Sequence, residues 1–496
     1  MIEAYAVPDV RAAERLAMGR LPDGELMQRA ATGLAEVVAA RLGEHRPSAQ
    51  PGTVVVLVGP GDNGGDALYA GARLADRFPV TAVPVTAKTH EAGLAAARAA
   101  GVTLTSPAEG AAALAGADVV VDGMLGIGGR PGLSAELERL IDAIPEDAYV
   151  VAVDLPSGAD PAGEEPAVSS LFADETVTFG VAKPVHLLPG TEAATGRLTV
   201  VDIGLDEALA ELGPTPAVER LTHDDVARLW PRPGPTDDKY SRGVLGVVAG
   251  GQAYTGAPVM TVTAAVESGA GMVRYVGTAR PTDLVRAAVP EAVFGEGRVQ
   301  AWVVGPGLDA QDDSGPGQEQ VGAARRALGS AQPCLVDAGG LDLLDRYTLP
   351  RRAPTLLTPH AGELARLLGR LEGREISRQE VSDHPLRHAR ALADRARATV
   401  LLKGSTTLVV DPIEAGTPAR AQADAPAWLA TAGAGDVLAG VAGTLLAAGL
   451  DPRDAGSLAA LVHGVAAHRA NPGGPVRAMA VAHGIPAVVA HLLHRS

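Results

Sequence analysis

The sequence holds a single cysteine, Cys334, and its basic residues are outnumbered by acidic ones. One cysteine excludes an intrachain disulfide and a metal site built from several thiolates. Its apolar neighbours Leu335 and Val336 indicate that it packs in a core. The net charge of −16 disfavours sequence-independent binding to nucleic acid or to an anionic membrane, which needs a basic face, although a local basic patch is not excluded.

Long apolar runs are absent as well. The longest uncharged one, residues 437–450, is too short and too rich in glycine to span a bilayer. The first residues, Met1–Tyr5, lack the basic start followed by an apolar core that is typical of a signal peptide. We therefore expect a protein that works in the cytoplasm.

Length and composition predict a globular protein with more than one domain. The chain has 496 residues, of which 47% are hydrophobic and 20% charged, and it is too long for one ordinary core. A proline-rich stretch, Glu211–Pro216, separates two halves that both alternate apolar runs with helical segments. We expect two α/β domains, residues 1–213 and 217–496.

Short, fully apolar runs between helical segments are typical of parallel sheets that helices cover on both faces, a three-layer, Rossmann-like αβα arrangement. In the first half we expect strands at Val54–Val58, Val80–Val85, Asp118–Val121, Tyr149–Val153, Glu175–Phe179 and Leu198–Val201. In the second half we expect them at Val244–Val248, Met272–Val276, Ala301–Val304, Cys334–Val336, Thr355–Leu357 and Val400–Leu402. Helices are expected over Asp66–Asp76, Asp436–Ala448 and Leu458–Ala467, and a polar loop over Asp309–Gln318.

The segment Thr431–Gly440 is a turn of glycine and alanine that runs into a long apolar helix. Free backbone N–H groups and the positive end of the helix dipole make such a turn a site for anions. Asp436, in the first turn, is placed to act as a base next to a phosphate. Residues 400–407 form an apolar strand that ends in Lys403 and hydroxyl groups, a second set of phosphate partners. These features predict a nucleotide-using enzyme; the alternative is that Asp436 only caps the helix.

A second glycine-rich loop follows the first apolar strand of the chain. Gly59, Gly61 and Gly64 have the spacing of a dinucleotide-binding loop. Asp62 and Asn63 stand where a pyrophosphate would approach, and the next strand does not end in the acidic residue that binds a ribose. The loop also lacks the Gly-Lys-Ser/Thr sequence of a P-loop. The spacing alone is therefore weak evidence for an ordinary Rossmann coenzyme site.

Carboxylates also follow two later strands of the first half, at Asp122 and Asp154. Ligands of open parallel sheets bind outside the carboxyl ends of the strands, so these residues should converge with Asn63 and Asp66. Carboxylate, amide and hydroxyl oxygens suit a hard cation, and a spare aspartate suits proton transfer. Taken singly, each aspartate can instead be a helix cap or a turn residue.

The motif Gly59–Asp66, with Asp154–Gly158, resembles the NAD(P)H-hydrate epimerase family, which interconverts the C6 epimers of hydrated NADH and NADPH and binds potassium. The resemblance implies that Asp154 contacts the substrate as the base. It implies that K⁺ is held by Asn63, Asp122 and Ser157. It assigns the lining of the substrate to Asp62, Asn63, Gly64, Gly65 and Asp66, and to Gly126, Ile127, Gly128, Gly129, Arg130, Pro131 and Gly132.

Two positions of this half depart from the family pattern. Asp62 stands where the family usually has Asn, and Ala67 stands where it usually has Gly. The added negative charge of Asp62 bears on ion affinity or on substrate preference, and the expected fold accommodates both changes.

The second half resembles the ADP/ATP-dependent NAD(P)H-hydrate dehydratases, which have a ribokinase-like fold. The resemblance lies in Lys239–Gly243, Tyr254–Ala257, Gly305–Leu308, Thr358–Glu363, Lys403–Thr407 and Thr431–Gly440. It implies that the adenine nucleotide is bound by Lys403, Gly404, Ser405, Thr406, Thr407 and Gly435. It implies that the hydrated nicotinamide is contacted by Ala257, Gly307, His360 and Asp436, although a lone histidine is as often structural.

This half departs from its family too. Val336–Gly340 replaces the usual Asp-Ala-Asp-Ala and so lacks one carboxylate, and Ala361 replaces a usual proline. The second change is mild, whereas the first leaves the role of the missing carboxylate open.

The implied chemistry fits these residue types. Water added across the C5=C6 bond of nicotinamide leaves a C6 hydroxyl, which is a poor leaving group, and its phosphorylation makes departure easy. Asp436 can remove the hydroxyl proton while the backbone amides of residues 433–435 stabilise charge on the phosphoryl group. We expect ADP, or ATP, as co-substrate, with Mg²⁺ on the nucleotide.

The favoured hypothesis is thus a bifunctional repair enzyme of small-molecule substrates, an isomerase and a lyase in one chain, forming a homo-oligomer. One alternative is a ribokinase-like kinase of a vitamin precursor with an N-terminal binding module, because Gly433–Asp436 is also a good kinase signature. Another is a binding module with the fold of an mRNA-decapping scaffold, which the acidic charge disfavours.

Overall fold

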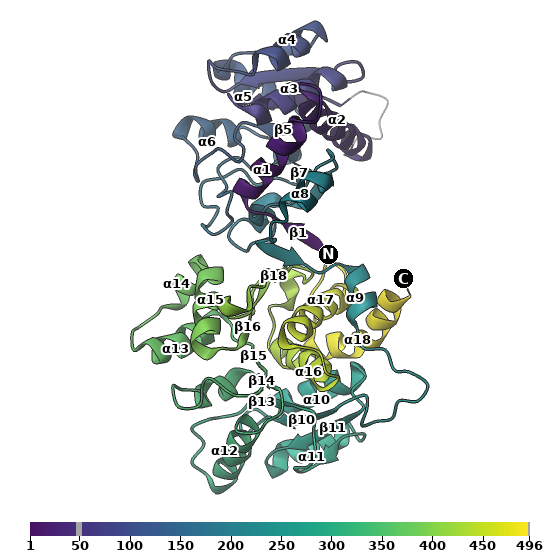
Figure 1. Cartoon of the computed structure of the whole chain (residues 1–496), viewed down its shortest axis with the longest axis vertical. Helices are drawn as coiled ribbons and strands as arrows, with labels where there is room; N and C mark the ends of the chain where they lie inside the picture. Colours follow the sequence, from purple (N-terminus) through teal and green to yellow (C-terminus); the bar gives the residue numbers. More distant parts are fainter. Residues whose placement is uncertain (46–51, 495–496) are drawn as a thin grey trace. The chain divides into compact units, whose positions relative to one another are not determined.

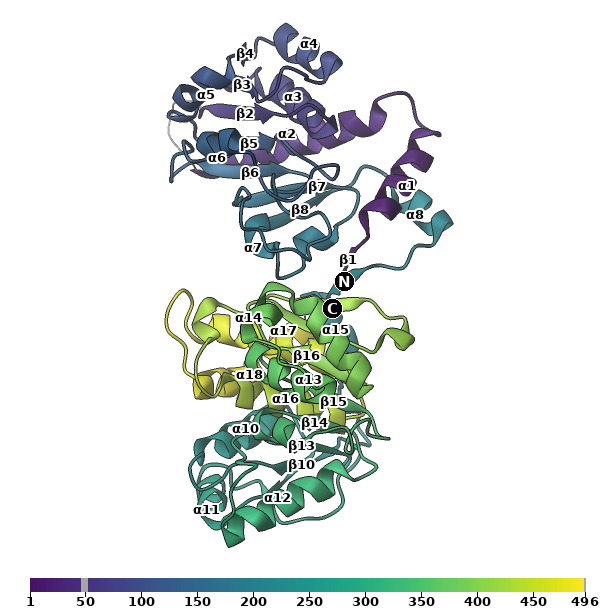
Figure 2. The same ribbon diagram turned by 90° about the vertical axis from the view of Figure 1, so that its left-hand side faces the viewer.

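The computed structural model describes residues 1–45 and 52–494. They form two compact units, one of Glu3–Val218 and one of Glu219–Ser496 together with Met1–Ile2. Each unit is built on a β-sheet of its own (Figures 1 and 2). No helix in the described ranges is both long and apolar enough to cross a membrane.

The sheet of the first unit is entirely parallel. In the described part of the chain it has seven strands in the order β4-β3-β2-β5-β6-β7-β8. Their bounds are β2 (Val54–Val58), β3 (Val80–Pro84), β4 (Thr103–Leu104), β5 (Val119–Gly123), β6 (Tyr149–Val153), β7 (Glu175–Phe179) and β8 (Arg197–Val201). The helical segments are α1 (Val7–Met18), α2 (Glu25–His45), α3 (Asp62–Leu74), α4 (Glu91–Ala99), α5 (Pro107–Leu114), α6 (Ala135–Ile141), η1 (Pro184–His186), α7 (Glu192–Thr195) and α8 (Asp206–Leu212).

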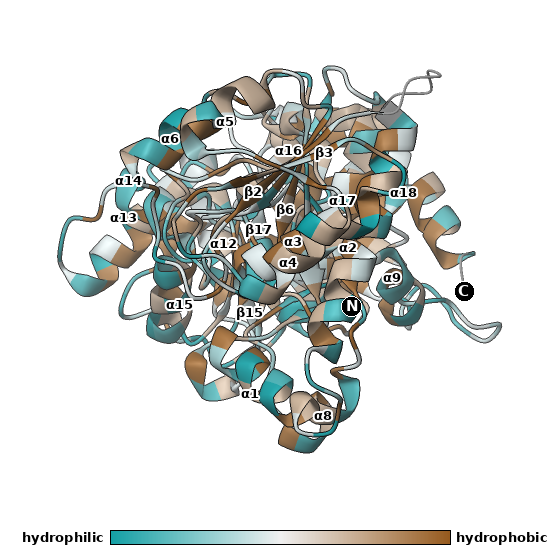
Figure 3. Cartoon of the chain, turned by 90° about the horizontal axis from the view of Figure 1, so that it is seen from above, coloured by the Kyte–Doolittle hydropathy of each residue, from teal (hydrophilic) through white to brown (hydrophobic). Residues whose placement is uncertain are grey.

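Alternate residues of β2 show why this sheet is a middle layer. Val54, Val56 and Val58 join the core formed with α2 and α3, whereas Val55 and Leu57 join a separate core with α5 and α6. Successive side chains of a strand point to opposite faces, so a strand without polar residues needs helices on both sides. Figure 3 shows the strand beside the β2 label in the brown of hydrophobic residues. The three-layer αβα prediction for this unit is confirmed.

The second unit holds a larger, mixed sheet. Among the described residues its strand order is β1-β9-β18-β17-β16-β15-β14-β13-β10-β11-β12, with the stretch from β12 to β16 parallel and β17 and β18 antiparallel. Strand bounds are β1 (Ile2–Ala4), β9 (Val218–Arg220), β10 (Val244–Val248), β11 (Met272–Val276), β12 (Val293–Phe294), β13 (Ala301–Val304), β14 (Cys334–Val336), β15 (Thr355–Leu357), β16 (Thr399–Leu402), β17 (Thr407–Val410) and β18 (Ala419–Gln422).

Helices also cover both faces of this second sheet. They are α9 (His223–Leu229), α10 (Gly256–Glu267), α11 (Ala279–Ala288), α12 (Gly315–Leu328), η2 (Ala338–Leu343), α13 (Ala361–Glu372), α14 (Arg378–Asp383), α15 (Pro385–Ala396), η3 (Ile413–Ala415), η4 (Ala427–Leu429), α16 (Ala434–Ala447), α17 (Pro452–Ala470) and α18 (Ala478–Leu493). Figure 1 shows α10, α16, α17 and α18 on one side and α12, α13 and α15 on the other. The predicted α/β fold of the second half is confirmed.

Two glycine contacts fix how α3 and α16 begin. A Cβ on Gly64 would lie 2.2 Å from the carbonyl oxygen of Gly59, so only glycine allows α3 to start this close to the end of β2. Gly433, the N-cap of α16, has a φ of 89°, and a Cβ there would lie 2.3 Å from Sδ of Met260 in α10. Both helices therefore begin at the carboxyl edge of their sheets, where parallel strands present their ends to a ligand.

Candidate functional site

Asn63 connects three strand ends in the first unit. Its side-chain Nδ2 donates to the carbonyl oxygen of Val153, at the end of β6, over 2.7 Å, and to that of Leu125, after β5, over 3.2 Å. A Cβ on Gly126 would lie 2.4 Å from Oδ1 of Asn63, so the loop after β5 closes directly onto this amide. Asp62, the first residue of α3, is exposed. The structure therefore brings together the predicted loop residues of β2 and β5.

Asp122 and Ser157 form a buried pair next to this amide. Ser157 Oγ donates to Oδ1 of Asp122 over 2.6 Å, and Ser157 N donates to Oδ2 over 2.8 Å. The N–H of Met124 also donates to this carboxyl, and the N–H of Leu125 donates to Ser157 Oγ. Complete burial raises the pKa of Asp122, although these hydrogen bonds favour the ionised form.

Asp154 stands directly after β6 in a conformation that is rare for a residue with a side chain, with a φ of 69°. Its Oδ1 accepts hydrogen bonds from Lys183 Nζ, over 2.7 Å, and from Thr178 Oγ1, over 2.9 Å. His186 Nε2 donates to its carbonyl oxygen over 2.7 Å. Burial alone would raise the pKa of Asp154, but the Lys183 ammonium and the hydrogen bonds from Lys183 and Thr178 together outweigh it and lower that pKa, so Asp154 is held as a carboxylate.

Three of these partners were missed by the sequence reasoning. Thr178 lies in β7, and Lys183 and His186 lie just beyond its end. The rule that led to Asp122 and Asp154, that polar residues after parallel strands converge, also applies to Lys183. Burial, with Lys183 beside it, lowers the pKa of His186 to about 4, so this imidazole is neutral.

Asp66 lies one turn into α3 and is only 7% exposed. Its Oδ1 is buried and has no hydrogen-bond partner among the described residues. Burial raises the pKa of Asp66 well above its usual range, and the carboxylates of Asp154, Asp62 and Glu14 raise it further. The pKa values of two aspartates in one site are thus shifted in opposite directions: the shift favours the ionised form of Asp154 and the neutral form of Asp66.

The segment Gly126–Gly132, which was predicted to line the substrate, follows β5 and lies beside Asn63. Gly129 N donates to the Gly126 carbonyl over 2.7 Å, and Gly132, with a φ of 91°, donates to the Gly158 carbonyl over 2.8 Å. A Cβ on Gly128 would lie 3.3 Å from a guanidinium nitrogen of Arg11 in α1. The side chain of Ile127 packs on the small core of Leu155, Ala159 and Val185. Arg130 and Pro131 are exposed.

In the second unit, Lys403 lies between the end of β16 and the start of α16. Its Nζ is 2.6 Å from Oδ1 of Asp337, which follows β14, and 3.7 Å from Oε2 of Glu363. A Cβ placed on Gly435 would lie 3.4 Å from the same Nζ. The strand end with Lys403 and the helix tip with Gly435 and Asp436 therefore meet in space.

Asp436 has a strongly shifted acidity. Burial and the nearby carboxylate of Asp337 raise its pKa to about 7, and the Lys403 ammonium opposes the shift. A carboxyl with that pKa is ionised in a large fraction at neutral pH and can still accept a proton readily. Its backbone carbonyl accepts a hydrogen bond from Thr261 Oγ1 in α10 over 3.1 Å.

His360 caps α13 beside Lys403. Its Nδ1 accepts hydrogen bonds from the N–H groups of Gly362, over 3.0 Å, and Glu363, over 3.3 Å, while His360 N donates to Oε2 of Glu363 over 2.8 Å. The backbone of Lys403 pairs with that of Pro359 and His360. Burial lowers the pKa of His360, so its exposed Nε2 face is neutral at pH 7. His360 has both a structural role and a place next to Lys403.

The remaining predicted residues lie along the same edge. Gly307, with a φ of 64°, follows β13, and a Cβ there would be 2.7 Å from Cβ of Ala257 in the first turn of α10. Gly404 and Ser405 form an exposed turn, Thr406 is buried, and Thr407 begins β17. Among the described residues, no hydrogen bond or ion pair joins Ala257 or Gly307 directly to Asp436; α10 connects them through Thr261.

Asp337 was not among the predicted site residues. It lies in the segment Val336–Gly340, in which this sequence lacks one of the family's carboxylates, yet it holds Lys403 and also accepts a hydrogen bond from Thr358 Oγ1 over 2.9 Å. A Cβ on Gly339 would lie 1.9 Å from the carbonyl oxygen of Leu308. A side chain at Gly339 would therefore displace the neighbouring backbone. The carboxylate retained at Asp337 is the one next to the helix tip.

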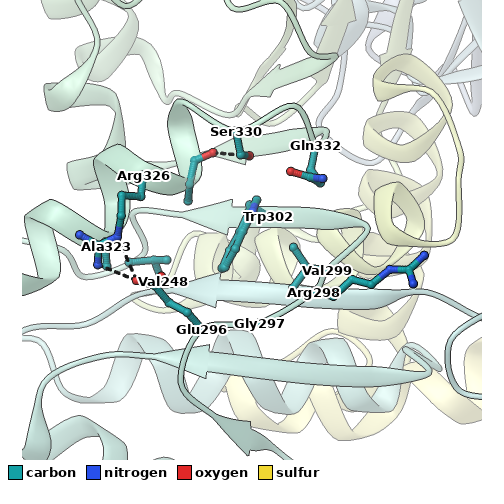
Figure 4. Close-up of a pocket in the computed structure, with 11 residues that line it drawn as sticks. Val248, Glu296, Gly297, Arg298, Val299, Trp302, Ala323, Arg326, Ser330 and Gln332 are labelled. Atoms are coloured by element: carbon teal, nitrogen blue, oxygen red, sulfur yellow. Dashed lines mark hydrogen bonds and ion pairs between the residues drawn. The ribbon is translucent and has the colours of Figure 1, made fainter.

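A cavity of about 210 Å³ in this unit lies apart from these residues (Figure 4). Its wall includes Trp302 and the ion pair of Arg326 and Glu296, whose atoms are 2.6 Å apart. Ser330 and Gln332 of its lining precede β14, whereas Asp337 follows that strand. This part of the cavity is at the opposite end of β14 from the site.

Comparisons with known proteins cover both units. The family model for NAD(P)H-hydrate dehydratase matches residues 245–483, and that for the YjeF-related protein N-terminus matches residues 23–185. The chain is 42% identical over 465 residues to the bifunctional NAD(P)H-hydrate repair enzyme Nnr of Mycobacterium tuberculosis (strain CDC 1551 / Oshkosh), covering 91% of this chain and 90% of the relative. It is 41% identical to that of Mycobacterium leprae (strain TN) over 93% of each chain. A crystal structure of ADP/ATP-dependent NAD(P)H-hydrate dehydratase from Bacillus subtilis, co-crystallised with ATP/Mg2+, aligns with a TM-score of 0.49 at 24% identity, over 55% of this chain and 99% of that chain.

Proposed function

Because this chain belongs to the bifunctional NAD(P)H-hydrate repair enzymes, we propose that its two activities occupy two separate sites. Epimerisation is assigned to residues 1–213 and dehydration to residues 217–496. The observation that carries the proposal is that each unit has, at the carboxyl edge of its own sheet, an aspartate with a charged neighbour and a shifted pKa: Asp154, 2.7 Å from the Lys183 ammonium, and Asp436, whose pKa burial and then Asp337 raise. The family assignment also decides against a vitamin-precursor kinase and against a bare binding module.

In the dehydratase site, Asp436 takes the proton of the C6 hydroxyl as that oxygen attacks the terminal phosphoryl group of the nucleotide. The N–H groups at the start of α16 and the Lys403 ammonium stabilise the charge that develops on the phosphoryl oxygens. The phosphate group then leaves C6 with the electron pair of the C–O bond, the proton on C5 passes to water, and the electrons of the C5–H bond form the C5=C6 bond of NAD(P)H. Ala257, Gly307 and His360 bind the hydrated nicotinamide.

The nucleotide partner of this site is proposed to be ADP, with ATP as the other possibility. Lys403, Gly404, Ser405, Thr406 and Thr407 bind it together with Gly435, since the Lys403 Nζ and the helix tip face the same point. Asp337 and Glu363 place carboxylate oxygens beside Lys403, the kind of donor that Mg²⁺ accompanying a nucleotide takes. When bound, Mg²⁺ neutralises part of the phosphate charge.

In the epimerase site, Asp154 is the base. Lys183 and Thr178 keep its carboxylate ionised and fixed in orientation, and His186 holds its backbone. The residues of Asp62–Asp66 and Gly126–Gly132 bind the substrate around it. The strained φ of Asp154 is consistent with a side chain that must be aimed at a ligand.

Asn63, Asp122 and Ser157 fit a potassium ion. Their amide, carboxylate and hydroxyl groups are hard oxygen donors. Asp122 is completely buried, and its contacts in the described part of the chain include no cationic side chain. A monovalent cation would compensate that charge. When bound, K⁺ would supply positive charge to the site and would hold together the loops after β2, β5 and β6, which these three residues already connect.

A location in the cytoplasm and a homo-oligomeric state complete the proposal. The cytoplasm is where NADH and NADPH turn over, and size-exclusion chromatography with light scattering measures the oligomeric state directly.

The test uses the purified full chain and the separated C6 epimers of hydrated NADH. With the S epimer, adding ADP should restore the absorbance of reduced nicotinamide, and ATP should do so more slowly. With the R epimer and ADP, recovery should require the N-terminal unit and should slow when Na⁺ replaces K⁺. Recovery from the R epimer no faster than its spontaneous epimerisation would refute the epimerase assignment.

A further inference from the structure

Asp66 combines burial with a lack of partners in a way that no other carboxyl of the N-terminal site does. Within the described residues, the carboxyl of Asp122 accepts three hydrogen bonds and that of Asp154 accepts two, whereas that of Asp66 accepts none and its Oδ1 is buried without a partner. An ionised carboxylate in that position would lose its hydration without compensation. Asp66 is therefore stable as the neutral acid, which can donate a proton.

The surroundings of Asp66 are acidic on several sides. The carboxylates of Asp154, Asp62 and Glu14 all act on it, and Glu14, in α1, is itself pushed toward the neutral form by burial. The ammonium of Lys183 in this cluster is paired with Asp154 over 2.7 Å. The titratable and charged groups around the start of α3 are Glu14 and Arg11 of α1, Asp62 of α3, His90 at the start of α4, Asp122 of β5, and Asp154, Lys183 and His186 beyond β6 and β7.

Building on the proposed epimerase site, we propose that Asp66 is the general acid of the epimerisation, paired with Asp154 as the general base. The unpartnered carboxyl donates its proton to the C6 hydroxyl of the substrate, which it reaches through the small part of its surface that stays exposed. Asp154, fixed as a carboxylate by Lys183, accepts a proton from the water that adds to the other face of the ring.

The steps balance as follows. The C6–O bond breaks, its electron pair leaves with the oxygen, and the oxygen takes the Asp66 proton to become water. The lone pair of the ring nitrogen forms a C6=N bond, which carries the positive charge. Water then attacks C6 from the opposite face, the C=N pair returns to nitrogen, and Asp154 accepts the proton that the water loses. The proton passes from Asp154 back to Asp66 through solvent, and no oxidant or reductant is needed.

The same arrangement explains why the two carboxyls differ. The reaction needs a proton donor on one face of the nicotinamide ring and a proton acceptor on the other. Two aspartates whose pKa values are shifted in opposite directions provide both at the same pH. If both were ionised, neither could protonate the leaving hydroxyl. If both were neutral, neither could activate the water.

The test compares the full chain with its Asp66→Asn variant, which keeps the size of the side chain and removes the acid. The interconversion of the C6 epimers is followed by chromatography without nucleotide, so that the dehydratase is idle. We expect a loss of about 10²–10⁴-fold in kcat with a much smaller change in KM. We also expect the wild-type rate to fall at high pH as Asp66 ionises, and this fall to be absent in the variant. A wild-type enzyme that does not epimerise would instead contradict the proposed function itself.

An unfolded N-terminal unit would also abolish epimerisation, so a second measurement is needed. Far-UV circular dichroism checks the fold, and formic acid added to an Asp66→Gly variant should restore epimerisation in proportion to the concentration of the undissociated acid. A wild-type rate with no fall at high pH would overturn the proposal. So would a folded Asp66→Asn variant within threefold of the wild-type kcat.

Discussion

The ammonium group of Lys403 lies 2.6 Å from Oδ1 of Asp337, and the same ammonium faces the tip of the helix that carries Asp436. Asp337 raises the pKa of Asp436 and Lys403 lowers it. Burial is the largest cause of the raised pKa of Asp436, and the two members of the ion pair adjust that pKa in opposite directions. The pair also offers a cation to a phosphate. Three predictions concern this arrangement, and one concerns the N-terminal site.

The pH dependence of dehydration should follow Asp436. A base works in its ionised form, so kcat/KM for the S epimer should rise with pH through about 7 and level off above it. Asp436→Asn should lower the rate by about 10²–10⁴-fold and abolish this rise, while epimerisation of the R epimer continues. A rate that instead falls with rising pH across this range would show that Asp436 acts as an acid.

The two neighbours of Asp436 should move this pH profile in opposite directions. Asp337→Asn removes a negative charge, so the midpoint should shift to lower pH. Lys403→Met removes a positive charge, so the midpoint should shift to higher pH, with a raised KM for the nucleotide. Thr358→Val, which removes the hydrogen bonds of Thr358 Oγ1 to Asp337 and to the Val336 carbonyl but no charge, is the matched control and should shift the midpoint less than either. Shifts of the same sign in both variants would rule out an electrostatic origin.

Gly435→Ala should weaken nucleotide binding without weakening the fold. The added Cβ would lie 3.4 Å from Lys403 Nζ, an ordinary contact, and Gly435 stands inside a helix where alanine is favourable. The methyl group would occupy space next to the backbone amides that bind phosphate, so the KM for ADP should rise about tenfold or more. Tryptophan fluorescence gives the unfolding midpoint of this unit, because Trp230, Trp302 and Trp428 all belong to it. An unchanged KM would place the phosphates elsewhere.

Lys183→Met should destabilise the N-terminal unit and stop epimerisation. Both members of the Lys183–Asp154 pair are buried, and removal of one partner leaves an uncompensated charge, at a cost of about 3–5 kcal/mol. The double variant Lys183→Met/Asp154→Asn should recover much of that stability because no charge remains. Urea unfolding followed by far-UV circular dichroism should show the loss, while the fluorescence transition of the three tryptophans should stay in place. Equal losses in the single and double variants would contradict the pairing.

The sequence predicts most of the fold because its strands are short, apolar and separated. Strands such as Val54–Val58, Tyr149–Val153 and Val244–Val248 are confirmed residue for residue. The hairpin of β17 and β18 was not expected, because strand Ala419–Gln422 contains Arg420 and Gln422, which are buried through ion pairs and hydrogen bonds that only the tertiary structure supplies.

Several expected boundaries were wrong, such as that of the helix expected over Leu458–Ala467, which runs over Pro452–Ala470, and two of them were wrong for local reasons. Helix α3 begins at Asp62 rather than at the expected Asp66, because the glycines at 64 and 65 pack against β2 and His90 instead of forming a loop. Helix α12 begins at Gly315, inside the expected loop Asp309–Gln318, because Ser314 caps it. Sequence rules for glycine and proline do not reveal such tertiary contacts.

In the candidate site, the aspartates at strand and helix ends could be predicted from the sequence. The charged neighbours that shift the pKa values of these aspartates could not. Asp154 and Asp436 were recognisable from their positions after a strand and in a first helical turn. Lys183 and Asp337 act on them from segments distant in the sequence, and only the sheet order brings these segments together. The roles of the site residues themselves stay predictions.

The central claim is that two complete and separate sites carry the two activities, and a mixing experiment tests it most directly. Asp154→Asn and Asp436→Asn, each in the full chain, are supplied with the R epimer and ADP. Neither variant alone should restore reduced nicotinamide faster than spontaneous epimerisation allows. An equimolar mixture should restore it faster, because Asp436→Asn supplies an intact epimerase site and Asp154→Asn supplies an intact dehydratase site. A mixture as inactive as its components, with both variants folded, would contradict two independent sites.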